Sequence, residues 1–210
     1  MNIDSIIFDL DGTLWDSSDV VLKSWNMGLS EYKELNKQIT KEELQGVMGM
    51  QIPQIGATFF PDIDIEVQTE IMEKCCTIEC DLIRKEGGNL YRNLEETLKI
   101  LSEKYKLIIV SNCQSGYIEA FLDYHCLEKY FIDIECAGNT GLSKGENIKK
   151  VMKKNMIEKA IYVGDTQGDC NASKLAEIPF VFASYGFGKV DSYDYIIEEI
   201  ADILNVINDV

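Results

Sequence analysis

The stretch "SIIFDLDGTLWDSS", Ser5 to Ser18, decides the fold of this 210-residue chain. An apolar run that includes Ile6 and Phe8 ends in two acids one residue apart, Asp9 and Asp11. Such a run is typical of a buried strand, whereas two neighbouring carboxylates repel each other and lose stability on burial. We therefore expect a positive group at this strand end, or a site that uses the acids in a reaction.

Similar apolar runs recur along the chain and predict the rest of a sheet. Four of them follow the first, at 107–111, 131–136, 161–165 and 180–184. Segments with helical periodicity lie between them, at 94–104, 116–124, 146–155 and 171–177, and a last helix is expected over 197–207. Because strands alternate with helices, the sequence predicts an α/β fold: a Rossmann-like parallel sheet core with helices on both faces.

One long segment interrupts this alternation. The residues from 16 to 88 contain four stretches with a helical pattern, at 18–36, 40–47, 53–59 and 65–85, and no convincing strand. The sequence "EGGN" at 86–89 is suited to a hinge back into the alternating pattern. We therefore expect an α/β core domain formed by 1–15 and 89–210, with an inserted α-helical cap domain over 16–88.

The overall composition excludes several classes of function. A net charge of -16 argues against nucleic acids and anionic membranes as partners, because both require basic surfaces. No run of apolar residues is long enough to span a bilayer, and no basic segment precedes the first apolar run. The seven cysteines are odd in number and lack the spacing of a zinc site, which favours reduced thiols and a cytoplasmic location. A small-molecule substrate is expected, with the chain a monomer or a homodimer.

Polar side chains gather where the predicted strands end. Ligands of an open parallel sheet bind at the carboxyl ends of its strands, which lie along one edge. A single Asp at such a position usually caps a helix, but several strand ends of this kind together indicate a site. The residues concerned are Asp9, Asp11, Ser111, Asn112, Asp165 and Asp169.

These residue types suit phosphoryl chemistry with a metal. Carboxylates such as Asp9 and Asp165 are ligands that Mg²⁺ prefers, and the cation would answer the repulsion between the acids. The hydroxyls of Thr13 and Ser111 can hold an anion. One carboxylate can attack phosphorus, and a second acid two positions later can protonate the leaving oxygen and then activate water.

Four short motifs resemble those of one family. "DLDGTLWD" from Asp9, "VSN" at 110–112, Lys144 in "GLSKGEN" and "VGDTQGD" at 163–169 are similar in order and spacing to the motifs of the haloacid dehalogenase-like superfamily. The helical insert between the first two resembles the small cap of its phosphoglycolate phosphatase-like branch.

The resemblance implies a Mg²⁺-dependent phosphatase of small phosphorylated metabolites. It implies that Asp9 attacks phosphorus and that Asp11 is the general acid and base. It further implies two sets of ligands, one for the phosphoryl oxygens (Thr13, Ser111, Asn112 and Lys144) and one for the metal (Asp9, the Asp11 backbone carbonyl and Asp165, supported by Asp169).

Two other features bear on the expected site. The cap segment "VMGMQIPQ" at 47–54 resembles the loop that faces substrate in this branch, which makes Gly49 and Gln51 candidate specificity residues. The same segment is also explained by one helix stopping at Gly49 and the next beginning near Pro53. The sole histidine, His125, is expected at a helix end or on the surface.

The sequence leaves other functions open. A phosphomutase of the same fold would use the same residues. A non-catalytic signalling or binding module with a phosphorylated Asp is a further alternative, although Asp11 and the helical insert count against a receiver. A dehalogenase is disfavoured because such relatives lack the Asp11 carboxylate. Phosphoglycolate, pyrophosphate, sugar phosphates and nucleoside monophosphates all stay open as substrates.

Overall fold

A six-stranded parallel sheet forms the centre of the molecule. The computed structural model describes residues 3–209, and the strands follow the order β5-β4-β1-β6-β7-β8. Every neighbouring pair in this sheet is parallel. The predicted α/β core is therefore confirmed, with strands β1 (Ser5–Phe8), β4 (Lys106–Ser111), β5 (Asp133–Cys136), β6 (Ala160–Gly164), β7 (Phe180–Ala183) and β8 (Tyr195–Ile197).

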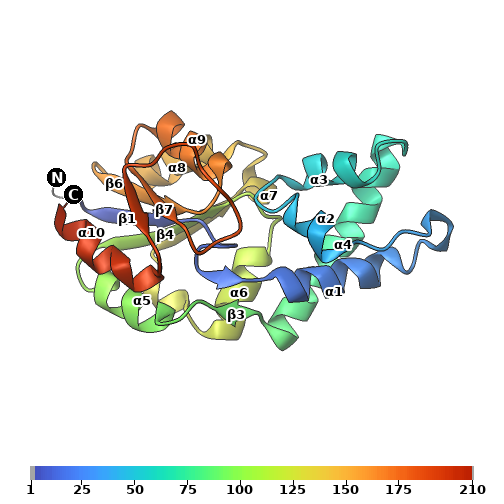
Figure 1. The fold of residues 1–210 in the computed structure, drawn as a ribbon, viewed down its shortest axis with the longest axis horizontal. Helices are drawn as coiled ribbons and strands as arrows, with labels where there is room; N and C mark the ends of the chain where they lie inside the picture. Colours follow the sequence, from blue (N-terminus) through green and yellow to red (C-terminus); the bar gives the residue numbers. More distant parts are fainter. Residues whose placement is uncertain (1–2, 210) are drawn as a thin grey trace.

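The central strand β1 contributes side chains to two hydrophobic cores, one on each face of the sheet. Ile6 and Phe8 join the larger core with residues of α5 (Leu94–Ser102) and α6 (Tyr117–His125). Ile7 joins the other core with residues of α8 (Lys144–Lys154) and α9 (Gln167–Ala176). Figure 1 shows these two helix layers above and below the sheet. Because both faces are covered, the strand is apolar without alternation.

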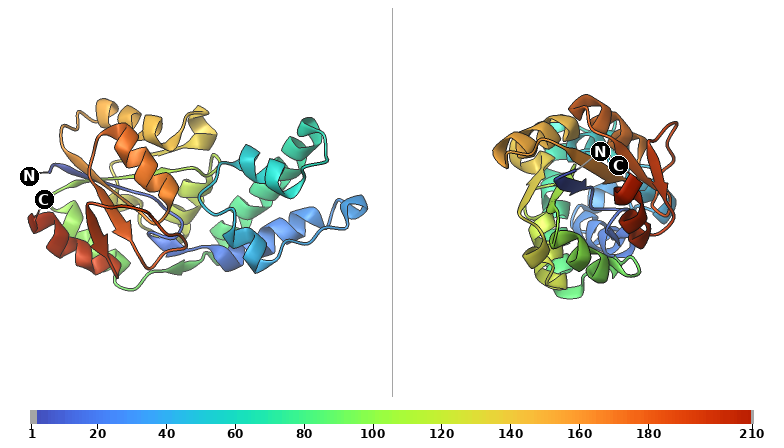
Figure 2. Two further views of the ribbon diagram at one scale, coloured as in Figure 1. Left: turned by 45° about the horizontal axis from the view of Figure 1, so that its top comes forward. Right: turned by 90° about the vertical axis from the view of Figure 1, so that its left-hand side faces the viewer.

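Four helices lie together beyond one end of the sheet, on the right in Figure 1. We call them the helical unit: α1 (Ser18–Leu29), α2 (Lys41–Gln45), α3 (Ile52–Phe59) and α4 (Ile65–Glu86). The long helix α4 packs along α1, with Trp25 and Cys75 buried between them. The unit faces the carboxyl end of the sheet, whereas both chain termini lie at the opposite end (Figure 2). The residue boundaries expected for a core and a cap stay a prediction.

A short ribbon joins the helical unit to the sheet. The strands β2 (Trp15–Asp16) and β3 (Asn89–Leu90) pair antiparallel where the chain leaves the sheet domain and returns to it. The expectation of no strand between residues 16 and 88 was therefore wrong at Asp16. A two-residue strand has no detectable periodicity, and only its pairing with a distant segment defines it.

The predicted C-terminal helix over 197–207 was wrong in its first half. The chain instead forms β8, whose Ile197 pairs with Ala183 of β7, and then a 3₁₀ turn at Ile200–Asp202. Helix α10 (Ile203–Asp209) follows. The apolar residues Ile200 and Ile203 are buried. Either an amphipathic helix or a strand followed by a turn would bury them, so the apolar pattern alone did not distinguish the two structures.

Several helix ends differ from those expected. Helix α1 stops at Leu29 rather than continuing to residue 36, and the chain then forms a 3₁₀ turn at Lys33–Leu35 that ends at Asn36, which has a positive φ of 42°. Helix α9 begins four residues earlier than expected because Thr166 and Asp169 form a capping box there. Ser143 caps α8 in the same way, so the helix begins at Lys144. Such caps satisfy backbone N–H groups that the first helical turn leaves free.

The remaining described elements are short. A 3₁₀ turn at Glu128–Tyr130 precedes β5, and helix α7 (Ala137–Thr140) follows that strand. All seven cysteines are free thiols. Within residues 3–209, none of the helices is both long enough and apolar enough to cross a bilayer.

Candidate active site

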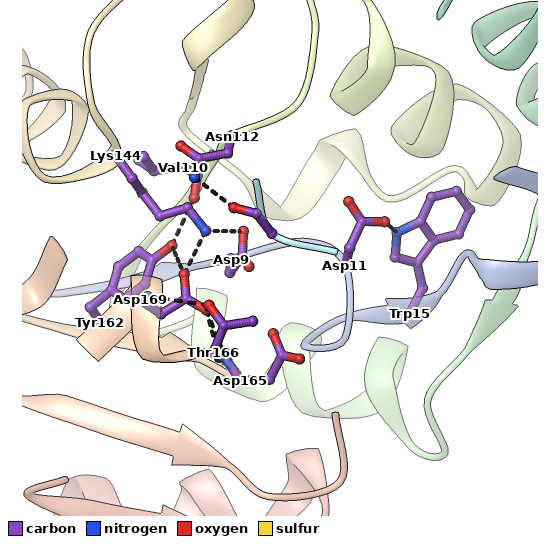
Figure 3. A network of polar contacts seen from close by, with 11 residues as sticks. Asp9, Asp11, Trp15, Val110, Asn112, Lys144, Tyr162, Asp165, Thr166 and Asp169 are labelled. Atoms are coloured by element: carbon purple, nitrogen blue, oxygen red, sulfur yellow. Dashed lines mark hydrogen bonds and ion pairs between the residues drawn. The ribbon is translucent and has the colours of Figure 1, made fainter. Parts of the chain in front are cut away.

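Three buried carboxylates meet at the carboxyl edge of the sheet. Asp9 follows β1, Asp165 follows β6, and Asp169 lies in the first turn of α9. One oxygen from each lies within 4.8 Å of the others. Figure 3 shows the three side chains converging on one point. The parallel register of β1 and β6 brings these acids together, because it sets the two strand ends side by side.

Lys144 supplies a positive charge to this cluster. Its Nζ lies 3.0 Å from Oδ1 of Asp9 and 2.5 Å from Oδ1 of Asp169. Burial alone would lower the pKa of Lys144, but Asp169 and Asp9 outweigh it and raise the pKa above its usual range. The ammonium therefore stays charged in a place where an unpaired Lys would lose its proton.

The acids outnumber the base, and their pKa values reflect it. Burial, followed by the charge of Asp169, raises the pKa of Asp9 to about 7, and Lys144 lowers it only in part. The same two causes, burial first, raise the pKa of Asp165 to about 8. A second positive charge would favour the ionised form of both carboxyl groups.

Asp169 holds the neighbouring groups in place. Its Oδ1 binds Lys144, and its Oδ2 accepts hydrogen bonds from the Thr166 hydroxyl at 2.7 Å, the Thr166 amide at 2.9 Å and the Asp165 amide at 3.2 Å. Tyr162 adds a longer contact of 3.4 Å to Oδ1. Since both oxygens are engaged, Asp169 orients Lys144 and the turn that carries Asp165. Its expected part in binding a metal stays a prediction.

The arrangement fits a hard divalent cation. Oδ1 of Asp9 and Oδ1 of Asp165 are buried without a hydrogen-bond partner, although the Asp9 oxygen forms the ion pair with Lys144. Gly12 has a φ of 75°, and a Cβ at this position would lie 2.2 Å from Oδ2 of Asp165. Glycine therefore lets the backbone after β1 approach that carboxylate closely. Buried carboxylate oxygens of this kind are ligands that Mg²⁺ takes.

The Asp11 carboxylate points away from Asp9. Its Oδ1 accepts three hydrogen bonds, from the Ser17 hydroxyl at 2.5 Å, the Tyr117 hydroxyl at 2.7 Å and the Trp15 indole at 3.0 Å. Figure 3 shows Asp11 on the side of Trp15, apart from the three-acid cluster. Burial raises the pKa of Asp11, and the three donors lower it.

The expected phosphate-binding residues lie around Asp9. Ser111 and Asn112, at the end of β4, line the same cavity as Asp9. The Asn112 amide donates to the Gly49 carbonyl at 2.8 Å, and its Oδ1 is buried without a partner. The Thr13 hydroxyl is also buried without a partner. The structure therefore gathers Asp9, Ser111, Asn112 and Lys144, while Thr13 lies in the turn after β1.

The two cap residues expected to face substrate have different positions. Gly49, with a φ of 82°, lines the cavity beside Asp9. Gln51 donates instead to the Leu142 carbonyl at 3.1 Å and lies beside a separate surface hollow with Lys144. The histidine, His125, is the last residue of α6, as expected, and its ring packs 5.7 Å from that of Trp15.

The cavity beside Asp9 includes residues that the motifs did not indicate. The helical unit contributes Trp25 and Glu79, and the core contributes Gln114 and Tyr117. Glu79 is buried and accepts a hydrogen bond from Gln114. One signal was available in the sequence: Glu79 interrupts the apolar face of α4 that Cys75 and the other buried residues form. A lone acid in such a face is uncommon unless it is paired.

Comparison with known proteins agrees with this geometry. The family model described as haloacid dehalogenase-like hydrolase matches residues 6–183. A phosphoglycolate phosphatase of Aquifex aeolicus is 30% identical, over 97% of this chain and 96% of that protein. The pyrophosphatase PpaX of Listeria welshimeri is 24% identical, over 99% of this chain and 97% of that protein. The crystal structure of a predicted phosphatase from Clostridium acetobutylicum superposes with a TM-score of 0.84 at 21% identity and covers 100% of both chains.

The chain belongs to the haloacid dehalogenase-like hydrolase family, and its relatives place it among the phosphatases of that family. The family predicted from the four motifs is thereby confirmed.

Proposed function

We propose that this protein is a Mg²⁺-dependent phosphatase that hydrolyses a small phosphate monoester through an aspartyl phosphate on Asp9. The observation that carries the proposal is the meeting of Asp9, Asp165 and Lys144 at one buried point. A carboxylate nucleophile, a cation-binding acid and a fixed ammonium are the groups that phosphoryl transfer to a carboxylate requires.

The metal would be held by Asp9, the backbone carbonyl of Asp11 and Asp165, with Asp169 behind them. Two buried oxygens support this assignment: Oδ1 of Asp165, which has no hydrogen-bond partner, and Oδ1 of Asp9, which has the ion pair with Lys144 but no hydrogen bond. Mg²⁺, when bound, supplies positive charge to the phosphoryl oxygens and to the attacking carboxylate. Lys144 contributes a second positive charge, and Ser111, Asn112 and Thr13 contribute hydrogen-bond donors to the same group.

The reaction has two half-reactions with Asp11 active in both. In the first, an Asp9 oxygen bonds to phosphorus, the ester P–O bond breaks, and Asp11 gives its proton to the leaving oxygen. In the second, Asp11 takes a proton from water, the water oxygen bonds to phosphorus, and the Asp9–phosphorus bond breaks. The burial that raises the pKa of Asp11 favours its protonated form at the start.

Asp11 has to change position for this role. Its carboxylate is bound to Ser17, Tyr117 and Trp15 in the present arrangement. We propose that residues 16–88, which include the helical unit, form a cap that acts as a mobile lid over Asp9. Closure of this lid accompanies the turn of Asp11 toward the leaving oxygen. The ribbon β2/β3, which carries Trp15, lies at the junction where such a motion would bend.

The test is phosphate release from a panel of phosphate monoesters and pyrophosphate, with Mg²⁺ and with EDTA. We expect release that EDTA abolishes, and a phosphorylated Asp9 in acid-quenched samples analysed by mass spectrometry. An Asp11→Asn variant is expected to slow both half-reactions. Release that continues unchanged in EDTA would contradict the metal requirement, and isomerisation of a sugar phosphate without free phosphate would indicate a phosphomutase.

A further inference from the structure

The cavity next to Asp9 has a largely apolar lining, unlike the charged cluster of Asp9, Asp165, Asp169 and Lys144. It lies between the helical unit and the carboxyl edge of the sheet, where a leaving group attached to phosphorus would extend from Asp9. Apolar side chains form a large part of its walls, with Val21, Leu44 and Ile55 among them. With a volume of about 50 Å³ it holds a compact group, since roughly 10–15 Å³ on this measure accommodates one water molecule.

None of the described residues that line this cavity is Lys, Arg or His. Its carboxyl groups are those of Asp9, Asp11 and Glu79. Arg84 shares helix α4 with Glu79 but contacts the Gly116 carbonyl at 3.4 Å and Asp123 at 3.7 Å, where its side chain is 41% exposed. A second anion on the substrate would lose its water here without gaining a cationic partner, which is costly.

Besides Tyr117 and the motif residues, the polar side chains that line the cavity include Trp25 and Glu79 of the helical unit and Gln114 of the core. Gln114 donates to Oε2 of Glu79. The side chain of Trp25 lines the same cavity as Glu79, and its indole N–H is buried without a partner in hydrogen-bond geometry. Trp25 is only 3% exposed, so water does not readily compensate this donor.

A hydroxyl group matches these two partners better than other groups of the same size. It can accept from the Trp25 N–H and donate to the Glu79 carboxylate at once. An ammonium has no acceptor for Trp25, and a methyl group satisfies neither partner. A carboxylate or phosphate would add a negative charge to a cavity whose lining includes Asp9 and Asp11 and no lysine, arginine or histidine. Burial raises the pKa of Glu79 to about 8, and the protonated carboxyl can still bind a hydroxyl as donor or acceptor.

We propose that this cavity selects a phosphate monoester whose leaving group is compact, uncharged and hydroxylated, with Trp25 and Glu79 binding the hydroxyl. The inference rests on the proposed phosphatase function. It sets the substrate apart from phosphoglycolate and pyrophosphate, the compounds named for the relatives, because each of these carries a second anionic group.

The experiment compares kcat/KM for phosphate release from five matched compounds: glycerol phosphate, propyl phosphate, phosphoethanolamine, phosphoglycolate and pyrophosphate. We expect glycerol phosphate to exceed propyl phosphate by about 10–100-fold, since a site built to bind a hydroxyl rejects the analogue without it. The two anionic compounds are expected to be poorer still.

Variants assign the selectivity to the two side chains. Trp25→Phe removes the N–H and keeps an aromatic ring, and Glu79→Leu removes the carboxyl and keeps an aliphatic body. Each is expected to lower the ratio of glycerol phosphate to propyl phosphate about tenfold or more, whereas Glu79→Gln retains most of it because the amide still binds a hydroxyl. Glu73→Gln, an exposed change on the same helix, is the charge-matched control and is expected to keep the wild-type ratio.

The outcomes separate this inference from the function on which it rests. Release from phosphoglycolate or pyrophosphate in preference to glycerol phosphate overturns the inference and leaves the phosphatase intact. Ratios that do not change in Trp25→Phe and Glu79→Leu, with both variants folded by circular dichroism, overturn the assignment to these side chains. No release from any compound, p-nitrophenyl phosphate included, overturns the phosphatase function itself and the inference with it.

Discussion

The ammonium of Lys144 lies 3.0 Å from Oδ1 of Asp9, in a cluster that holds three buried acids and this one base. When all of these groups are ionised, two negative charges stay uncompensated by protein. Burial, followed by the charge of Asp169, raises the pKa of Asp9 to about 7 and that of Asp165 to about 8, and Lys144 lowers each only in part. A divalent cation balances the charge of the cluster.

Replacing Lys144 with Met is expected to reduce kcat/KM by about 100-fold or more, because one fixed charge on the transferring group is lost. It also leaves buried carboxylates without their partner, at an expected cost of about 3–5 kcal/mol in unfolding free energy. Steady-state kinetics and urea denaturation measure the two effects. Lys149→Met, an exposed change on the same helix, is the control for both. Equal activity in the two variants would count against Lys144.

Replacing Asp9 with Asn is expected to reduce turnover by about 10⁴-fold or more, as for other removed nucleophiles. The folded state is expected to keep its stability or gain some, because a neutral amide replaces a carboxyl whose ionised form burial disfavours. Phosphate release and thermal unfolding of the same preparation test both statements. Appreciable turnover in rigorously purified protein would refute Asp9 as the nucleophile.

Replacing Tyr117 with Phe removes the donor 2.7 Å from Oδ1 of Asp11. Because that hydrogen bond lowers the pKa of Asp11, its loss is expected to raise this pKa. The limb of the kcat/KM profile that reports Asp11 in the free enzyme then moves to higher pH. Tyr124→Phe on the same helix is the control. A lower kcat with an unchanged profile would indicate a structural role alone.

The metal-free protein is expected to lose stability as the pH rises. Asp9 has a pKa of about 7 in the folded state against 3.8 for the free group, and Asp165 behaves alike with a value of about 8. The folded state therefore binds more protons than the unfolded state between these values. The stabilisation is full below pH 3.8 and is lost as the pH rises through about 7 to 8.

Melting temperatures in EDTA between about pH 6 and pH 9 measure this loss, whose slope reaches about 1.4 kcal/mol per pH unit for each group. Mg²⁺ is expected to restore the stability and to displace protons when it binds, which calorimetry in buffers of different ionisation enthalpy detects. A melting temperature in EDTA that rises over this range contradicts the sign of the effect.

The contact from Asn112 to the Gly49 carbonyl, 2.8 Å long, joins the core to the helical unit beside Asp9. We expect a phosphate analogue with Mg²⁺ to slow amide hydrogen exchange in the segment 47–51 and in β2 and β3, since a closed lid protects both. Asn112→Ala is expected to lessen that protection. Exchange that is the same with and without the analogue contradicts lid closure.

The sequence was informative where a local pattern of residue types is typical of one kind of structure or site. The apolar run before Asp9, the strand and helix alternation, and the acids at the strand ends predicted the sheet and the three-acid cluster. Lys144 was indicated by its motif, and the structure brings it to Asp9. Strand β8 and the ribbon β2/β3 were missed because pairing with distant segments, rather than local pattern, defines them.

The amino-acid sequence by itself therefore determined the parallel sheet, the helical insert and the residues that gather at Asp9, because periodicity and short motifs are local properties. Only the tertiary structure decided where Asp11 points and which side chains line the cavity beside Asp9. Trp25, Glu79 and the pair Gln114 and Tyr117 come from three separate places in the chain. They meet because α1 and α4 pack over the end of the sheet. No local sequence pattern specifies this packing between distant segments.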